Sequence, residues 1–178
     1  MILGLDLSLT SSGAVFLDKD YKVTNTAVLS VPHTGVERLF HLENLFLDFI
    51  NNIDVDLVCL ESPAFQAQGH IFSIGELNGI IKLNLFKKGI TIIEVAPSQL
   101  KKYVTGKGKG NKSVIIKEIY KQWNEDFSDD NIADGYVLSR IGSDYYIKYI
   151  LREEIKLPKH QEDVLYKIYK KYNEIKLI

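Results

Sequence analysis

The hydrophobic pattern of the chain changes after residue 31, and this change limits the folds that the chain can adopt. Residues 1–7, 13–17 and 22–31 have strand patterns and are separated by short polar turns. Over residues 34–50, apolar side chains recur every three or four positions, as in an amphipathic helix with Thr34 as N-cap. Further on, residues 56–61 and 90–95 favour buried strands, and residues 72–86, 111–123 and 129–141 favour helices, the last with Ser128 as N-cap.

This order predicts an α/β fold with a mixed five-stranded sheet flanked by helices. The short turns make the first three strands antiparallel, and helical crossovers lead to the last two. We expect residues 1–142 to form one domain and residues 143–178 to form a helical C-terminal extension of that domain, rich in tyrosine and lysine.

The composition excludes several classes of protein. With 46% hydrophobic and 25% charged residues, the chain is typical of a folded globular domain. Its apolar runs fall short of the ~20 residues of a membrane helix, and residues 1–6 lack the basic start of a secretory signal, so we expect a cytoplasmic protein. Cys59 is the single cysteine, which excludes an internal disulfide. The four histidines are scattered, and we expect no histidine metal site.

The net charge of −1 conceals an uneven distribution. Residues 101–121 contain seven lysines and one acid, a local charge of +6, so the rest of the chain carries −7. Such segregation suggests that one surface meets a polyanion while another gathers carboxylates, although a lysine-rich stretch can also be plain solvated surface.

Four acids stand at the ends of apolar elements. Asp6 interrupts the first strand pattern, Glu61 ends a buried run, and Asp130 and Asp134 lie four apart near the start of a helix and so share one face. Buried carboxylates that converge need a counter-charge, which Mg²⁺ can provide. Two such ions ~4 Å apart support phosphodiester hydrolysis. Each acid alone also has a structural reading, as a strand end or as a helix N-terminal charge.

Four motifs carry a resemblance to a known family. They are residues 4–13 (GLDLSLTSSG), 60–65 (LESPAF), 101–112 (KKYVTGKGKGNK) and 130–136 (DNIADGY). In this order over residues 1–142, they resemble the RuvC family of Holliday junction resolvases, within the RNase H-like superfamily. The chain looks most like the short RuvC-like proteins of phages and low-GC bacteria.

The resemblance implies a homodimeric endonuclease that cuts four-way and possibly other branched DNA, with two Mg²⁺ ions per active site and Mn²⁺ as a substitute. Asp6, Glu61 and Asp134 match the motif acids. The family has its last two aspartates three apart, whereas this chain has Asn131 at that position. Asp130 or Asn131 is therefore the fourth ligand, and we favour Asp130 because a carboxylate offsets cation charge. Gly135 replaces the usual alanine.

The lysine-glycine stretch is expected to bind DNA. It lacks the Gly-Lys-[Ser/Thr] of a Walker A loop, so we expect no nucleotide cofactor. Lysines beside glycines can follow a phosphate backbone, whereas Lys112 is the residue that we place nearest the scissile phosphate as a catalytic group. Phe65 either stacks on an unpaired base or packs on its own domain. The expected DNA contacts are Phe65, Lys101, Lys102, Lys107, Lys109 and Lys112.

Three other interpretations stay open. An RNase H-like nuclease acting on RNA or on an RNA–DNA hybrid would use the same acids, and a catalytically silent DNA-binding module would keep the basic loop. Residues 6–13 also resemble the phosphate motif of actin-like ATPases, but the chain is too short for the two domains of that class. Residues 72–86 can supply a dimer seam or a stripe facing the core, and the tail can extend a binding face or only cover the core.

Overall fold

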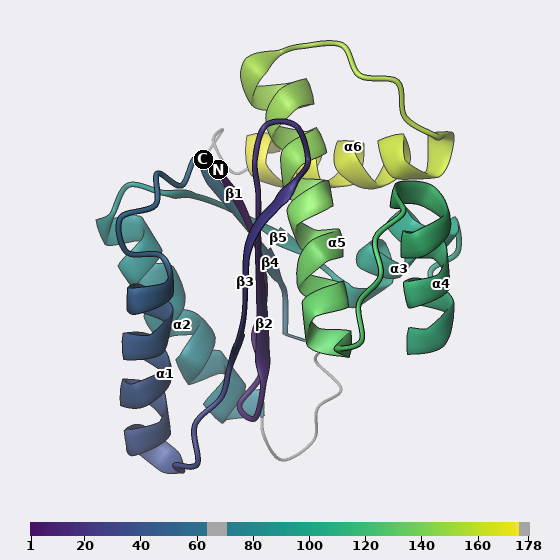
Figure 1. Ribbon diagram of the computed structural model, residues 1–178. Helices are drawn as coiled ribbons and strands as arrows, with labels where there is room; N and C mark the ends of the chain where they lie inside the picture. The colour runs from purple at the N-terminus through teal and green to yellow at the C-terminus, as the bar shows by residue number, and fades with distance from the viewer. Residues whose placement is uncertain (64–70, 175–178) are drawn as a thin grey trace.

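The computed structural model describes residues 1–63 and 71–174 and contains a central five-stranded sheet (Figure 1). The strands are β1 (Ile2–Asp6), β2 (Ser12–Leu17), β3 (Val23–Leu29), β4 (Leu57–Glu61) and β5 (Thr91–Val95). Their spatial order is β3-β2-β1-β4-β5. Strands β1, β2 and β3 pair antiparallel, while β4 lies parallel to both β1 and β5. The predicted mixed sheet is therefore confirmed.

Helices cover both faces of this sheet (Figure 1). Helices α1 (Gly35–Phe49) and α2 (Ile71–Lys87) lie on one face. On the other face lie α3 (Pro97–Thr105), α4 (Lys112–Trp123), α5 (Asp130–Tyr145) and α6 (Lys159–Glu174). Strand residues alternate between the two hydrophobic cores, so that Leu3 and Leu5 belong to the α1–α2 side and Ile2 to the α5 side.

Helix α5 crosses β1 and β2 at backbone contact distance because glycines line the crossing. A Cβ atom built on Gly4 would lie 2.0 Å from the carbonyl oxygen of Gly135, and one on Gly13 would lie 1.9 Å from the carbonyl oxygen of Asn131. No side chain fits in either place. The glycines of the first motif therefore allow the N-terminal turns of α5 to lie directly on the sheet.

Two local expectations were wrong. No helix was predicted over residues 97–105, yet they form α3, with Pro97 in its first turn and the left-handed Gly106 (φ 74°) at its end. Lys101 and Lys102 are thus helical. The N-cap of α5 is Asp129 rather than Ser128, because the Asp129 carboxylate accepts hydrogen bonds from the backbone N–H groups of Asn131 and Ile132.

The C-terminal segment continues the same fold. Helix α5 extends beyond residue 142 to Tyr145 and passes into a π-helix (Tyr146–Leu151). Helix α6 buries Val164, Leu165 and Ile168 in the core on the α5 side of the sheet. Among the described residues, no helix has the length and apolar character required to cross a membrane.

Candidate active site

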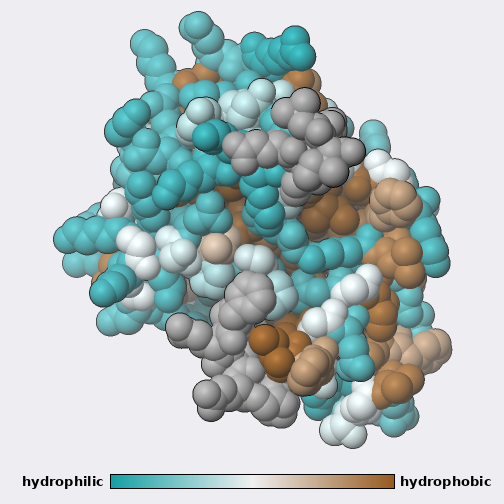
Figure 2. Space-filling view, turned by 180° about the vertical axis from the view of Figure 1, so that it is seen from behind, coloured by the Kyte–Doolittle hydropathy of each residue, from teal (hydrophilic) through white to brown (hydrophobic). Residues whose placement is uncertain are grey.

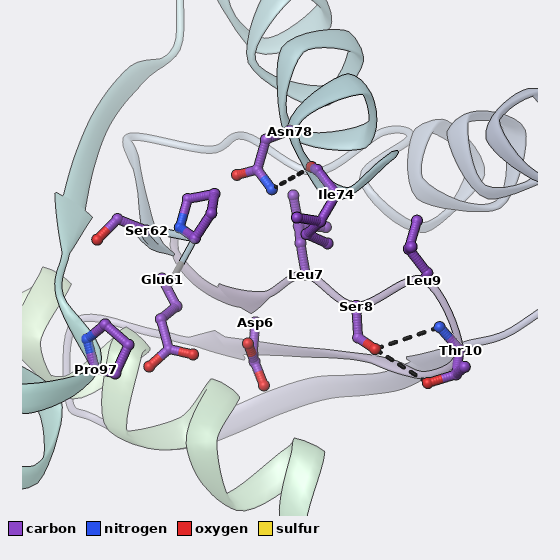
Figure 3. A pocket seen from close by; sticks show the side chains of 11 residues that line it. Asp6, Leu7, Ser8, Leu9, Thr10, Glu61, Ser62, Ile74, Asn78 and Pro97 are labelled. Carbon is purple, nitrogen blue, oxygen red and sulfur yellow. Dashed lines mark hydrogen bonds between the residues drawn. The ribbon is translucent and has the colours of Figure 1, made fainter. Parts of the chain in front are cut away.

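Asp6 and Glu61 face each other at one edge of the sheet (Figure 3). Each is the last residue of its strand, and β1 and β4 are parallel neighbours whose register pairs Leu5 with Leu60. The two carboxyl groups therefore leave the sheet at the same edge, within hydrogen-bonding reach of each other. Strand register alone brings together two acids that are 55 positions apart in the sequence.

Helix α5 adds two more acids. The charge of Asp134 acts on Glu61, and the charge of Asp6 acts on Asp134, so these three side chains form one electrostatic cluster. Asp130 lies one turn earlier on the same helix and makes a 3.1 Å ion pair with the Nζ of Lys112. The structure thus brings together all four acids proposed from the sequence, from three separate elements.

Burial and mutual repulsion raise the pKa values of the clustered acids. The pKa of Glu61 rises to about 9, first because the group is buried and next because of the negative charge of Asp6. The pKa of Asp134 rises to about 6 for the same two reasons. Burial also raises the pKa of Asp6, against the opposing effects of its hydrogen bond with Glu61 and the charge of Lys112. The cluster therefore needs positive charge to be fully ionised at neutral pH.

Two lysines supply part of that charge. The Lys112 ammonium interacts with Asp6, Asp130 and Asp134, and its hydrogen bond to Asp130 raises its own pKa. Lys101 lowers the pKa values of Glu61 and Asp134 through its charge. Lys101 was expected only to contact the DNA backbone, and its nearness to the acids was missed because α3 was not recognised.

The other expected DNA contacts have different surroundings. Lys102 is paired with Asp163 of α6 at 3.2 Å, which ties α3 to the C-terminal helix. Lys107 and Lys109 are exposed between α3 and α4. Phe65 lies outside the described residues.

The side-chain amide of Asn131 is engaged in hydrogen bonds outside the three clustered acids. Its side-chain amide donates to the Ser11 hydroxyl and to the Asp129 carboxylate, both at 3.2 Å. These contacts fasten the start of α5 to the turn after β1. They favour Asp130 over Asn131 as the fourth oxygen ligand.

A pocket of about 330 Å³ adjoins Asp6 and Glu61 (Figure 3). Its other lining residues are Leu7, Ser8, Leu9, Thr10, Ser62, Pro63, Ile74, Asn78 and Pro97. The Asn78 amide group donates to the carbonyl of Ile74, and its buried Oδ1 has no partner among the described residues. Asn78 was not singled out from the sequence, where a single asparagine within an apolar helix is a weak signal.

The donor set fits a hard divalent cation. Carboxylate oxygens are the ligands that Mg²⁺ and Mn²⁺ prefer, and a cation would offset the repulsion that raises the pKa of Glu61. In the described part of the chain, the acids do not form a group of three whose ligand atoms all lie within 4.8 Å of one another. Side-chain rotation must therefore accompany ligation by three or more of them.

Comparison with known proteins matches the chain to one family. The family model described as "Crossover junction endodeoxyribonuclease RuvC" matches residues 2–136. A curated relative of that name from Halothermothrix orenii is 26% identical over 147 residues, covering 78% of this chain and 89% of the relative. Another from Petrotoga mobilis is 30% identical over 125 residues, covering 67% of this chain and 77% of the relative.

Solved structures with the same fold include two bound to four-way DNA. Thermus thermophilus RuvC in complex with a Holliday junction substrate matches with a TM-score of 0.66 and 18% identity, over 78% of this chain and 89% of that one. The Fowlpox virus resolvase in complex with Holliday junction DNA matches with a TM-score of 0.51 and 15% identity, over 79% of this chain and 96% of that one. These likenesses confirm the predicted RNase H-like architecture.

Proposed function

The chain belongs to the RuvC family of crossover junction endodeoxyribonucleases, and we propose that it is a structure-selective endonuclease that resolves four-way DNA junctions. The observation that supports this function best is the convergence of Asp6, Glu61 and Asp134 from β1, β4 and α5. The relatives described above carry the name of a crossover junction endodeoxyribonuclease, which favours this function over the RNA-acting alternative. We further propose that residues 1–142 form the nuclease domain, with residues 143–178 as its extension, in the cytoplasm of a bacterium or of a phage-infected host.

Asp6, Glu61, Asp130 and Asp134 would hold two Mg²⁺ ions, for which Mn²⁺ would substitute. When bound, such ions activate a water and stabilise the leaving oxygen. The water oxygen forms a bond to phosphorus and the bond to the 3′ oxygen breaks, which leaves 5′-phosphate and 3′-hydroxyl ends.

The chain's own groups orient and balance this reaction. Lys112 lies beside Asp130 with its side chain mostly exposed, so its ammonium can reach a phosphate and stabilise the charge that develops there. Lys101 keeps Glu61 and Asp134 closer to their ionised forms. Lys107 and Lys109 contact the flanking backbone, which contributes affinity without base information. Lys102 forms an ion pair with Asp163 that ties α3 to α6, and this pairing weakens its attraction to a DNA phosphate.

A second copy of the chain would cover the outer side of α1 and α2. Hydrophobic side chains gather on this side of the molecule (Figure 2), and Phe72, Leu83 and Phe86 of α2 are 86%, 52% and 78% exposed. Ile81 and Leu85, by contrast, are buried in the chain's own core. Exposed apolar patches of this kind mark interaction sites. A homodimer would present two active sites to the two symmetric strands of a junction.

Sedimentation of two matched variants tests the dimer. Phe86→Glu places a charge in the patch and should convert a dimer to a monomer. Tyr120→Glu, at an aromatic side chain of α4 that is 57% exposed on the other face, should leave the mass unchanged. Equal masses for wild type and both variants would contradict this interface.

Cleavage of labelled substrates tests the activity. A four-way junction, a linear duplex and an RNA–DNA hybrid are each incubated with the protein, with and without Mg²⁺. We expect paired symmetric nicks in the junction and only with the cation. Asp6→Asn should bind the junction without cutting it, while Asp126→Asn, at an exposed acid, should cut normally. Preferential cutting of the hybrid, or undiminished cutting by Asp6→Asn, would overturn the proposal.

A further inference from the structure

Three side chains with metal-binding groups meet at the start of α1, away from the acidic cluster. His33 lies in the connection from β3 to α1, and Glu37 and His41 follow at intervals of four residues. Glu37 and His41 therefore share one side of α1, and His33 lies just before the first residue of the helix. In the described part of the chain, they are the group of three whose ligand atoms all lie within 4.8 Å of one another. The expectation that the histidines are scattered was therefore wrong for this pair.

The contacts within this triad hold its members close together. The Nδ1 of His33 lies 3.2 Å from a carboxylate oxygen of Glu37. The imidazole rings of His33 and His41 stack with centroids 4.2 Å apart and planes at 19°. These contacts already gather one carboxylate and two imidazoles, and a neutral imidazole is a common metal ligand.

The backbone before the helix is also held in place. The Arg38 guanidinium donates a 2.7 Å hydrogen bond to the carbonyl oxygen of His33. Gly35 has a φ of 56°, a left-handed conformation that glycine adopts without strain. This turn leads the chain from His33 into the helix. Because the backbone at His33 is already hydrogen-bonded to α1, ordering it adds less to the entropic cost of binding a ligand.

We propose that His33, Glu37 and His41 bind one transition-metal ion of the Zn²⁺ class, with water in the fourth position. Two imidazoles and one carboxylate form a ligand set that Zn²⁺, Co²⁺ and Ni²⁺ favour, while Mg²⁺ favours the all-oxygen acidic cluster. Tetrahedral binding brings the ligand atoms to about 3.3 Å from one another. The side chains of His33 and Glu37 are 32% and 66% exposed, so they can rotate by this amount.

The triad lies at the same edge of the sheet as the acidic cluster, although none of its three residues lines the pocket beside Asp6. Strands β1 and β3 both pair antiparallel with β2, so they end at the same edge of the sheet, where α1 begins (Figure 1). The Ser30 hydroxyl donates a 2.7 Å hydrogen bond to the carbonyl of Thr10, which lines the pocket beside Asp6. A metal that joins His33 to α1 therefore secures the connection that borders this pocket.

Titration of metal-free protein without a histidine tag tests the site. We expect one Zn²⁺ to bind per chain by calorimetry in the presence of excess Mg²⁺, and Co²⁺ to give the visible absorption of tetrahedral coordination. Zn²⁺ should raise the unfolding temperature as a ligand of the folded state. His33→Ala and His41→Ala should each weaken binding by about 100-fold or more, and Glu37→Gln by about tenfold.

The controls separate this site from the acids. Asp48→Asn, at an exposed acid of the same helix, and Glu61→Gln should leave the Zn²⁺ affinity unchanged. Circular dichroism verifies that each variant is folded, and Glu37→Gln keeps the size of the side chain if a histidine variant fails. Zn²⁺ binding that survives His41→Ala and Glu37→Gln, or that is lost in Glu61→Gln, would overturn the proposal. None of these measurements depends on nuclease activity.

Discussion

Gly4 of β1 lies against Gly135 of α5 so closely that a Cβ on Gly4 would be 2.0 Å from the carbonyl oxygen of Gly135. This contact between two backbones brings the first turns of α5 onto the strand that ends in Asp6. The adjacent residue on the helix is Asp134, so the glycine contact also determines how near the two carboxylates lie. The glycine in the first motif is thus a requirement of packing and, through packing, of the acidic cluster.

Alanine at the two glycines should have very different effects. Gly4→Ala directs its methyl group into the backbone of α5 and should lower the free energy of unfolding by about 3 kcal/mol or more. A Cβ on Gly135 meets a methyl group of Val15 at 3.2 Å and the backbone of Gly13 at 3.3 Å, contacts that a shift of a few tenths of an ångström relieves, and alanine also favours the helix. Gly135→Ala should therefore change stability by about 1 kcal/mol or less. Denaturant unfolding measures both, and similar losses would contradict the packing argument.

Neutralising a clustered acid should stabilise the metal-free protein while abolishing cleavage. Burial and the charge of Asp6 disfavour ionised Glu61, so folding at about pH 8 requires a protonation that Glu61→Gln makes unnecessary. We expect the unfolding temperature of the variant at this pH to rise by about 3 °C or more. Asp126→Asn serves as the control, and a lower unfolding temperature for folded Glu61→Gln would contradict the unfavourable surroundings of the Glu61 carboxylate.

The stability of the metal-free protein should fall as the pH rises. Glu61 has an ordinary pKa of 4.5 and a folded-state pKa of about 9, so the folded state binds more protons between these values. Asp134 adds to the effect between 3.8 and about 6. The contribution of each acid to stability is complete when the pH is below its ordinary pKa. It is lost as the pH rises through the folded-state pKa of that acid. Thermal melts across this range should show the decline, and Glu61→Gln should flatten its upper part.

The lysines should separate into catalytic and binding groups. Lys112→Met should slow cleavage by about 10- to 100-fold, because its charge lies at the acidic cluster. Lys107→Ala should weaken junction binding and lower the salt dependence of affinity by roughly one unit of slope. Single-turnover cleavage and binding at several salt concentrations distinguish the two. A loss of binding alone in Lys112→Met would remove its catalytic role.

A buried carboxylate outside the active site should matter for stability. Asp144 of α5 accepts hydrogen bonds from the hydroxyls of Tyr21, at 2.5 Å, and Tyr103. Asp144→Ala leaves the buried Tyr103 hydroxyl without this partner and should cost about 3 kcal/mol. Tyr21→Phe removes one hydrogen bond and should cost about 1 kcal/mol. Urea unfolding gives both values, and equal effects would contradict the greater role of Asp144.

The local elements were predictable because their signals are local. The alternation and spacing of apolar residues revealed all five strands and the helices α1, α2, α4 and α5, and short turns revealed the antiparallel part of the sheet. Helix α3 was missed because the lysines and glycines after residue 100 suggested a loop. Its signal was present in Pro97 at the start and Gly106 at the end.

The sequence by itself determined the type of fold and the acids of the candidate site, since strand ends and motif spacing are visible along the chain. Tertiary structure alone placed Lys101 beside those acids and turned Asn131 toward Ser11. The four-residue spacing of His33, Glu37 and His41 was visible in the sequence, whereas the turn that brings His33 to the other two was not. The physical reason is that such meetings depend on strand register, on the glycine contact that seats α5, and on the turn at Gly35. These are relations between segments, and hydrophobic spacing within one segment carries no record of them.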